Sequence, residues 1–420
     1  MINVQVQFMD TFTTIAALFT VSSLISYINQ RYVKLPGTIG IMVISIVLSI
    51  IILIAGKSLP TAFHFIKELN ASVDFTRTLL DVMLAFLLFA SALHFDFEKL
   101  KQQKFPVLIL STVGVVGSTT IFGFLFYYTL PFFGIDVPIL YCLLFGALIS
   151  PTDPVAVLSV LKKSRIPKSL ETIIGGESLF NDGAGILLFV ILRELTEDSS
   201  VVFTWSHTLQ LFTQEVFGGV LLGLASALIC SYLIKRIADL QTILMITIAM
   251  VMGIAVLGGL LHVSIPLAAV AAGLMLSNVK LASTDDAVPL NTILNKIWGL
   301  IDDLLNTILF VMIGLQIAVI HFYAAYWLIS LLAIVFVLIA RAVSITAPAM
   351  LLGRRLALPN KRIIIVIWAG LRGGISVALA LSLPDSEFKP MIVSISYIIV
   401  VFSIIVQGLT LNKVVNKLTD

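Results

Sequence analysis

Charged side chains are scarce in this sequence. Only 12% of its 420 residues are Asp, Glu, Lys or Arg, whereas soluble globular domains average about 25%. The net charge of +3 is small and the basic residues are scattered, which argues against a nucleic-acid-binding surface. Cysteine is nearly absent, because Cys142 and Cys230 lie in separate apolar runs without a disulfide or metal-ligand spacing. A Walker-type phosphate loop is also missing, so we expect no metal or nucleotide cofactor.

Apolar residues fill most of the chain. They make up 59% of it, and the mean hydropathy of +1.09 is too high for one buried core. Thirteen runs are each long enough to cross ~30 Å of hydrocarbon as a helix. They lie near residues 9–28, 37–56, 76–94, 105–129, 139–160, 172–194, 211–234, 239–260, 264–280, 295–320, 326–350, 361–384 and 390–412. We therefore predict an all-α polytopic membrane protein with about 13 transmembrane helices.

The loops of this topology carry their positive charge on one side. Of the 26 basic residues, 19 fall in loops at alternate ends of the predicted spans. These are Arg31, Lys34, Lys99, Lys101, Lys104, Lys162, Lys163, Arg165, Lys168, Lys235, Arg236, Lys280, Lys296, Arg354, Arg355, Lys361, Arg362, Lys413 and Lys417. The opposite side holds Lys57, Lys67, Arg77, Arg193 and Lys389. Because basic loops stay cytoplasmic, we predict a cell (inner) membrane protein with its N-terminus outside and its C-terminus inside.

Two predicted spans contain helix-breaking residues. Ser150-Pro151-Thr152-Asp153-Pro154 interrupts the fifth span and Gly370-Leu371-Arg372-Gly373-Gly374 the twelfth. With the seventh span as a linker, the others form two six-helix halves in which spans 5 and 12 are equivalent and run in opposite directions. Membrane helices also tolerate simple kinks. Paired interruptions, however, are typical of the site between inverted repeats of a transporter.

The sixth predicted span carries two carboxylates among apolar residues. Asp182 lies roughly 15 Å from the start of the span near residue 172, close to the middle of the bilayer. Ser178 shares the helix face of Asp182, and Glu177 shares that of Asn181. Ionisable residues at this depth are costly and are a default functional hypothesis.

Burial disfavours the charged form of such a carboxylate, so Asp182 can hold a proton or an alkali cation but not both. Competition of this kind is the basis of a cation/proton exchanger. A hydrogen-bonded structural role for Asp182 is the alternative. The residues expected near Asp182 at the first break favour cation/proton exchange. The unwound backbone there frees carbonyls for an ion, and Thr152 adds a hydroxyl. Asp153 is either an ion ligand or, as a Thr-Asp-Pro sequence favours, the cap of the second half-helix.

Arg341 and Arg372 fall inside predicted spans and need partners, because an unpaired buried charge is costly. We expect a structural pair between Glu177 and Arg341. Arg372 is expected to supply a counter-charge where the two broken helices cross.

These residues belong to motifs that resemble a known family. Ser150-Pro-Thr-Asp-Pro-Val155, Gly176-Glu-Ser-Leu-Phe-Asn-Asp-Gly183, Ile301-Asp-Asp-Leu-Leu-Asn306 and Gly370-Leu-Arg-Gly-Gly374 are similar to those of the monovalent cation:proton antiporter-1 family. The NhaP-type sodium/proton antiporters are the best match within it. The resemblance covers essentially the whole chain, with the motifs in the family's order.

The resemblance implies a single transporter domain over 1–420 that forms a homodimer. Residues of about 9–94 and 239–320 would build the dimerisation bundle, 211–234 the linker helix, and 105–194 with 326–412 the ion-transporting core. The broken fifth and twelfth helices would cross in that core.

Residue by residue, the resemblance makes Asp182 the ion and proton carrier, with Ser178 and Thr152 as further cation ligands. Asn181, and Glu177 with Arg341, would organise the site. An Asn-Asp pair in this family goes with electroneutral exchange, which Asn181-Asp182 therefore implies.

One departure concerns the third span, where members often carry a glutamate. Here Leu87-Leu-Phe-Ala-Ser-Ala-Leu-His94 places Ala90 at that position, so one possible ligand is missing. In the tenth span, Asp302, Asp303 and Asn306 are expected at its cytoplasmic start, where electrostatics at the helix end account for them.

We therefore predict a secondary active antiporter, not an enzyme, that exchanges Na+ or Li+ for H+ by alternating access. A K+/H+ antiporter of the same fold is the nearest alternative. An intramembrane hydrolase that uses Asp153 and Asp182 as acid and base, or a cation channel, is a more remote one. The hydrolase explains neither the buried arginines nor the paired helix breaks, and a channel has no need for a single deep titratable carrier.

Overall fold

A computed structural model gives the fold of the chain. It describes residues 11–54, 78–161, 166–197, 205–279, 290–317, 320, 326–353, 356 and 358–419. Within these ranges every regular element is helical. Nine basic loop residues used above for orientation lie outside the described residues: Lys57, Lys67, Arg77, Lys162, Lys163, Arg165, Lys280, Arg354 and Arg355.

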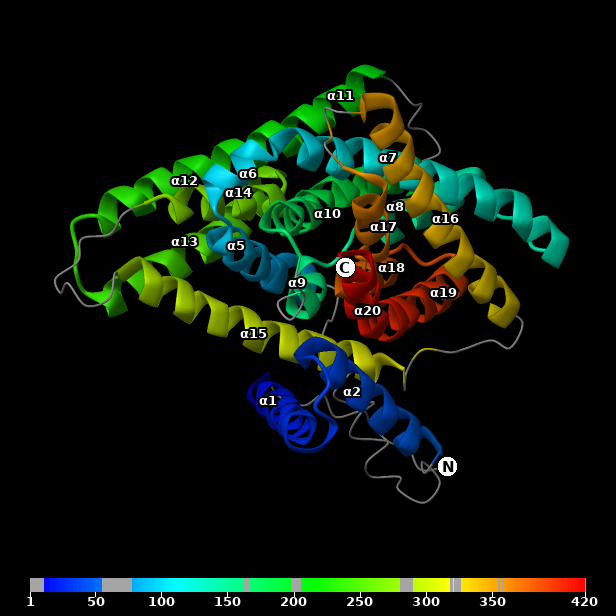
Figure 1. Ribbon diagram of the computed structural model, residues 1–420, viewed down its shortest axis with the longest axis horizontal. Helices are drawn as coiled ribbons and strands as arrows, with labels where there is room; N and C mark the ends of the chain where they lie inside the picture. The colour runs from blue at the N-terminus through cyan, green and yellow to red at the C-terminus, as the bar shows by residue number, and fades with distance from the viewer. Residues whose placement is uncertain are drawn as a thin grey trace.

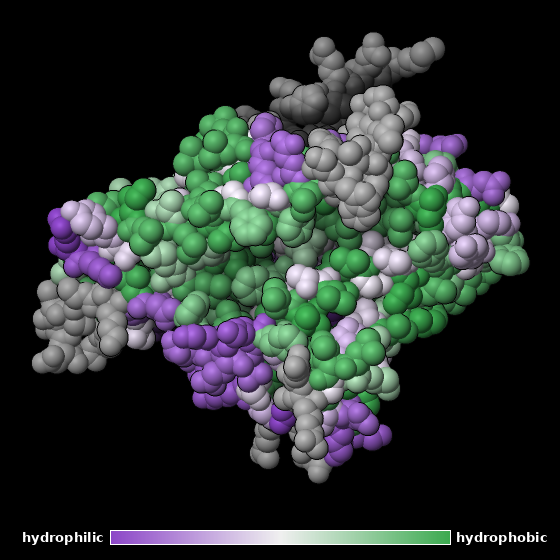
Figure 2. Space-filling view, turned by 90° about the horizontal axis from the view of Figure 1, so that it is seen from above, coloured by the Kyte–Doolittle hydropathy of each residue, from purple (hydrophilic) through white to green (hydrophobic). Residues whose placement is uncertain are grey.

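Ten helices of the described chain are long and apolar enough to cross a membrane. They are Phe12–Val33, Gly37–Ile54, Lys104–Phe133, Ile139–Leu161, Lys168–Thr196, Leu209–Ile234, Leu240–Leu261, Leu290–Gln316, Trp327–Leu352 and Lys389–Leu418. Two shorter apolar helices cover Thr78–His94 and Ile265–Ser277. Hydrophilic patches lie toward the margins of the surface in Figure 2, with a broad apolar surface between them. The prediction of an all-α, multi-pass membrane protein is confirmed at this level.

The long helix α7 (Lys104–Thr129) illustrates how polar residues are accommodated in such spans. The hydroxyl groups of Thr112 and Thr120 donate to the carbonyls of Leu108 and Val116, at 2.6 and 2.8 Å. Each hydroxyl is thereby satisfied within its own helix, which a lipid environment requires.

Short polar caps begin several helices. Asp239 accepts a hydrogen bond from the Thr242 amide at the start of α13 (Leu240–Leu261), at 2.8 Å. Ser264 caps α14 (Ile265–Ser277), which has a proline in its first turn. Side-chain oxygens at these positions satisfy amide groups that have no partner within the helix.

Both predicted interruptions are present in the structure. α8 (Ile139–Ile149) is separated from α9 (Pro154–Leu161) by four non-helical residues, and α17 (Asn360–Trp368) ends shortly before α18 (Gly374–Leu381). In Figure 1 the halves of both helices lie near the centre of the molecule, around α10 (Lys168–Glu197).

The buried apolar residues form two clusters. One contains residues of α5 (Leu84–His94), α12 (Gly219–Ile234), α13 and α14. The other contains residues of α2 (Gly37–Ile54), α7, α8, α16 (Trp327–Leu352), α17, α18 and α19 (Lys389–Phe402).

Four helices contribute to both clusters: α5, α7, α10 and α15 (Leu290–Gln316). α15 adds Trp298 to the first cluster and Phe310 to the second. α10 adds Leu179 to the first and Ile174 to the second. The helix that carries Asp182 therefore lies where the two packed groups of helices meet. The division into a dimerisation bundle and a core stays a prediction.

Candidate ion-binding site

The two breaks are joined by direct hydrogen bonds. The Asp153 amide donates to the Leu371 carbonyl at 2.7 Å. The Arg372 guanidinium donates to the carbonyls of Ser150 and Pro151, the latter at 2.9 Å. These carbonyls lie at the C-terminal end of α8, where unpaired oxygens and the helix dipole attract a cation. Arg372 therefore places its guanidinium at the point where the two broken helices meet.

Asp153 caps the second half of the broken helix. Its Oδ1 accepts from the amides of Val155 and Ala156 at 2.9 and 3.0 Å. Of the two roles considered for Asp153, this geometry is that of the N-cap. Gly373 packs directly against the Asp153 carboxyl group, where the Cβ of any other residue would collide with it.

Glu177 and Arg341 form a buried ion pair. Two parallel hydrogen bonds join them, each 2.7 Å long, and the side chains are 0% and 6% exposed. Arg341 also donates to the Val366 carbonyl at 3.3 Å. The charge of Glu177 is thus matched by a bidentate partner, the geometry that favours arginine in such pairs.

Asn181 connects this pair to the break in α8/α9. Its amide nitrogen donates to Glu177 Oε1 and to Thr152 Oγ1, both at 2.7 Å. Its amide oxygen accepts from the Thr152 backbone nitrogen at 3.2 Å. Thr152 Oγ1 also lies 2.8 Å from Ser178 Oγ. The predicted residues Thr152, Glu177, Ser178, Asn181 and Arg341 therefore form one connected network.

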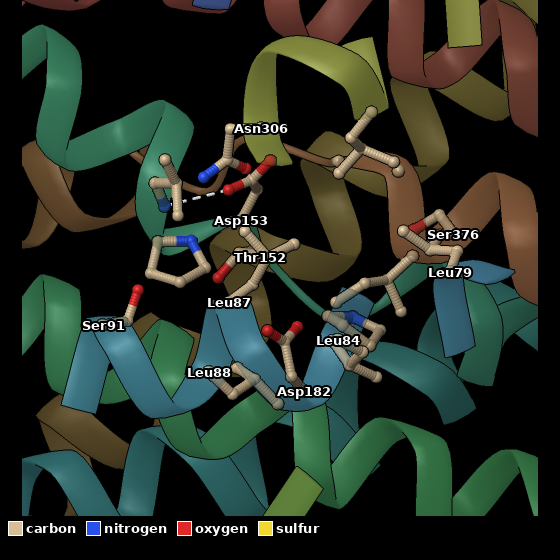
Figure 3. A pocket seen from close by; sticks show the side chains of 17 residues that line it. Leu79, Leu84, Leu87, Leu88, Ser91, Thr152, Asp153, Asp182, Asn306 and Ser376 are labelled. Atoms are coloured by element: carbon tan, nitrogen blue, oxygen red, sulfur yellow. Dashed lines mark hydrogen bonds between the residues drawn. The ribbon is translucent and has the colours of Figure 1, made fainter. Parts of the chain in front are cut away.

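Asp182 stands apart from this network. Its side chain is 1% exposed, yet its Oδ2 has no hydrogen-bond partner among the residues that the structure describes. Buried polar atoms are nearly always paired, so this oxygen is exceptional, and as a carboxylate oxygen it is chemically able to take up a proton or bind a cation. In Figure 3 the carboxylate points into a pocket, toward Thr152 and Asp153.

The pocket is narrow, with a cavity volume of about 30 Å³. About one water-sized species fits such a space. Its polar side chains are Ser91, Thr152, Asp153, Asp182, Asn306 and Ser376. Hydroxyl, amide and carboxyl oxygens are ligands for hard cations. In the described part of the chain, no group of three or more His, Cys, Asp and Glu residues could hold a metal ion.

Three of these polar residues were not predicted as site residues. Asn306 was expected near the cytoplasmic start of its helix, but α15 begins at Leu290 and places Asn306 well inside, 2% exposed. Ser91 is next to Ala90, which is fully buried and does not line the pocket. Ser376 follows the second break and also contacts the pocket. For Ser91 and Ser376 the available signal was a polar residue flanked by apolar ones, whereas Asn306 is followed by another polar residue, Thr307.

A helical membrane protein in which two discontinuous helices cross beside a buried carboxylate has the architecture of a secondary transporter. The chain belongs to the sodium/hydrogen exchanger family, because the family model described as "Sodium/hydrogen exchanger, transmembrane" matches residues 19–417. This confirms the resemblance found in the motifs.

Named relatives extend over nearly the whole chain. It is 40% identical to the Na(+)/H(+) antiporter NhaP of Pseudomonas aeruginosa over 415 residues, 96% of each chain. It is 30% identical to the Na(+)/H(+) antiporter NhaH of Halobacillus dabanensis over 416 residues, 98% of each. These relatives are named as antiporters, not enzymes, in agreement with the prediction of a transporter.

A solved structure has the same fold. The sodium proton antiporter MjNhaP1 from Methanocaldococcus jannaschii superimposes with a TM-score of 0.75, covering 98% of this chain and 99% of that one. The sequence identity is 18%, so this likeness concerns the fold.

Proposed function

We propose that this protein is a secondary active antiporter that exchanges Na+ or Li+ for H+ by alternating access, with Asp182 as the carrier. The observation that carries the proposal is the buried Asp182 Oδ2, which faces a pocket of oxygen-bearing side chains and has no partner among the described residues. The names of the relatives, Na(+)/H(+) antiporters, agree with it.

The mechanism follows from one carboxylate serving two ions. A proton on Asp182 removes the negative charge that attracts a cation, and a bound cation disfavours the proton. Ser178 and Thr152 are proposed as further cation ligands, since their hydroxyls lie together beside the break. At the helix crossing, Arg372 donates to the freed carbonyls. This contact would keep the geometry of the site constant while access changes from one side of the membrane to the other.

Electroneutral exchange is part of the proposal. Glu177 and Arg341 balance each other, and the neutral Asn181 uses its amide in the network. Asp182 is then the group whose charge changes, and it becomes neutral with either Na+ or H+ bound. One ion for one ion would move no net charge.

The finer features of the fold are proposed on the same basis. Ten candidate spans, two shorter helices and the α17/α18 pair would together make thirteen crossings in two inverted repeats. We propose a homodimer in the cell membrane with the N-terminus outside and the C-terminus in the cytoplasm.

Proton flux in proteoliposomes tests the function. Vesicles that contain the purified protein and a pH-sensitive dye are loaded at acid pH, and NaCl is added outside. Exchange should make the interior alkaline as protons leave. Asp182→Asn should abolish this signal, whereas Asp136→Asn, which changes an exposed loop aspartate, should leave it intact.

Three further conditions sharpen the result. Adding KCl in place of NaCl decides between Na+ and K+ as substrate. A persistent signal in Asp182→Asn, or cation flux without counter-moving protons, would contradict antiport. An imposed membrane potential should not change the initial rate if exchange is electroneutral.

A further inference from the structure

One wall of the pocket comes from helices other than the broken pair, and it has its own polar residue. α5 and α15 form this wall, with Leu84, Leu87 and Leu88 from α5 and Asn306 and Leu309 from α15. Asn306 lies in the pocket lining together with Asp153 and Asp182, and Figure 3 shows it beside Asp153. An amide at this place is surrounded mostly by leucine, so its buried polar atoms need partners.

The side-chain amide nitrogen of Asn306 already has hydrogen-bond partners. Its nitrogen donates to the Asp302 carbonyl at 2.9 Å and to Asp302 Oδ1 at 3.0 Å, one helical turn earlier. Because both N–H groups have acceptors on the same helix, the orientation of the amide is fixed. The oxygen is the group that Asn306 can offer to the pocket.

We propose that the Asn306 side-chain oxygen is a ligand of the transported cation and helps to set its selectivity. This inference rests on the proposed function, because it needs a cation at Asp182. A neutral oxygen suits the site, since it adds a ligand for a hard cation without adding a charge that a proton could neutralise. Asp182 would supply the exchangeable charge, and Asn306 would supply affinity from the wall that α5 and α15 form.

The composition of this side of the pocket explains why an amide is needed at residue 306. α5 contributes Ser91, Leu84, Leu87 and Leu88 to the pocket, and none of these is a carboxylate. Without Asn306, the cation would have an almost wholly apolar surface on this side. A cation loses its hydration on entering such a narrow space, so each missing oxygen weakens binding.

The experiment compares cation dependence in Asn306→Ala and Thr307→Ala. Thr307 is the next residue of α15, and its hydroxyl likewise donates one turn back, to the Asp303 carbonyl at 2.8 Å, on an exposed face. Initial rates of proton flux in proteoliposomes are measured against NaCl and, separately, LiCl. Asn306→Ala should raise the apparent KM for Na+ by about tenfold or more, as expected for a lost contact to a charged group. The maximal rate should change much less, and the ratio of the KM values for Na+ and Li+ should shift.

Asp302→Ala distinguishes a ligand from a structural residue. If Asn306 only stabilises α15 through Asp302, removing either partner should lower protein yield and maximal rate alike, with the KM and the Na+/Li+ ratio unchanged. That result would overturn the inference. Asn306→Asp should retain more Na+ affinity than Asn306→Ala, because it keeps an oxygen. If the wild type itself drives no proton flux with Na+ or Li+, the proposed function fails; if it does and Asn306→Ala keeps the wild-type KM, only this inference fails.

Discussion

The Glu177–Arg341 pair offers a sharp test of how buried charge holds this fold. Replacing Glu177 by Gln would leave the Arg341 guanidinium buried with one neutral acceptor in place of a carboxylate. Both side chains are nearly inaccessible, at 0% and 6% exposed, so water cannot compensate. Breaking a buried pair by removing one partner typically costs about 3–5 kcal/mol.

The thermal midpoint of the protein in detergent reports this loss. At roughly 2 °C per kcal/mol for a large domain, Glu177→Gln or Arg341→Gln should lower the midpoint by about 6–10 °C. The double variant should lose less than the sum of the single losses, since neither charge is then left alone. In a double-mutant cycle, we expect a coupling free energy of at least ~2 kcal/mol between the two substitutions.

An exposed pair of the same chain is the control. Asp385 and Lys389 are 3.0 Å apart, but Asp385 is fully exposed. Asp385→Asn should therefore shift the midpoint by less than about 2 °C, because exposed ion pairs contribute at most about 1 kcal/mol. Strictly additive losses at Glu177 and Arg341, or single losses as small as that of the exposed pair, would refute the reasoning.

Two other predictions concern local geometry. Gly373→Ala should reduce transport by about tenfold or more, because its methyl group would push against the Asp153 carboxyl at the crossing; Gly253→Ala, with open space around it in α13, should leave the initial rate unchanged. Asp239 lies outside the spans, and its hydrogen bonds to Thr242 hold the pKa of its carboxyl below the usual value of 3.8. Its stabilisation of the fold is therefore present above about pH 4 and is lost as the pH falls through the lowered pKa. The difference in thermal midpoint between wild type and Asp239→Ala should shrink over that range, and a constant difference down to pH 3 would contradict this assignment.

Much of the site could be predicted because its residues break the pattern of an apolar chain. Glu177, Asp182, Arg341 and Arg372 are charges within long hydrophobic runs, and the cost of burying a charge makes each of them conspicuous. The two breaks could be found for a similar reason, since Pro and Gly interrupt otherwise regular helices. The structure brings all of these features to one place.

The residues that escaped prediction are neutral. Asn306 and Ser91 carry no charge, so the sequence did not distinguish them from polar residues that bond within their own helix. Their relevance depends on which face of α15 and of α5 is turned toward the pocket, and packing at the junction of the two clusters decides this. A shift of only a few residues in the expected start of α15 moved Asn306 from the membrane surface to the pocket.

The neutral amide of Asn181 next to Asp182 has an energetic consequence for a cell. If the exchange moves no net charge, the membrane potential cannot drive it, and the sodium gradient can only mirror the proton gradient. Each pH unit across the membrane then supports about a tenfold sodium gradient. A medium that is more acidic than the cytoplasm would drive protons in and sodium out until the two ratios are equal. When the medium is more alkaline than the cytoplasm, the same exchange would instead carry sodium in and acid out, as long as the ratio of sodium outside to inside exceeds that of protons.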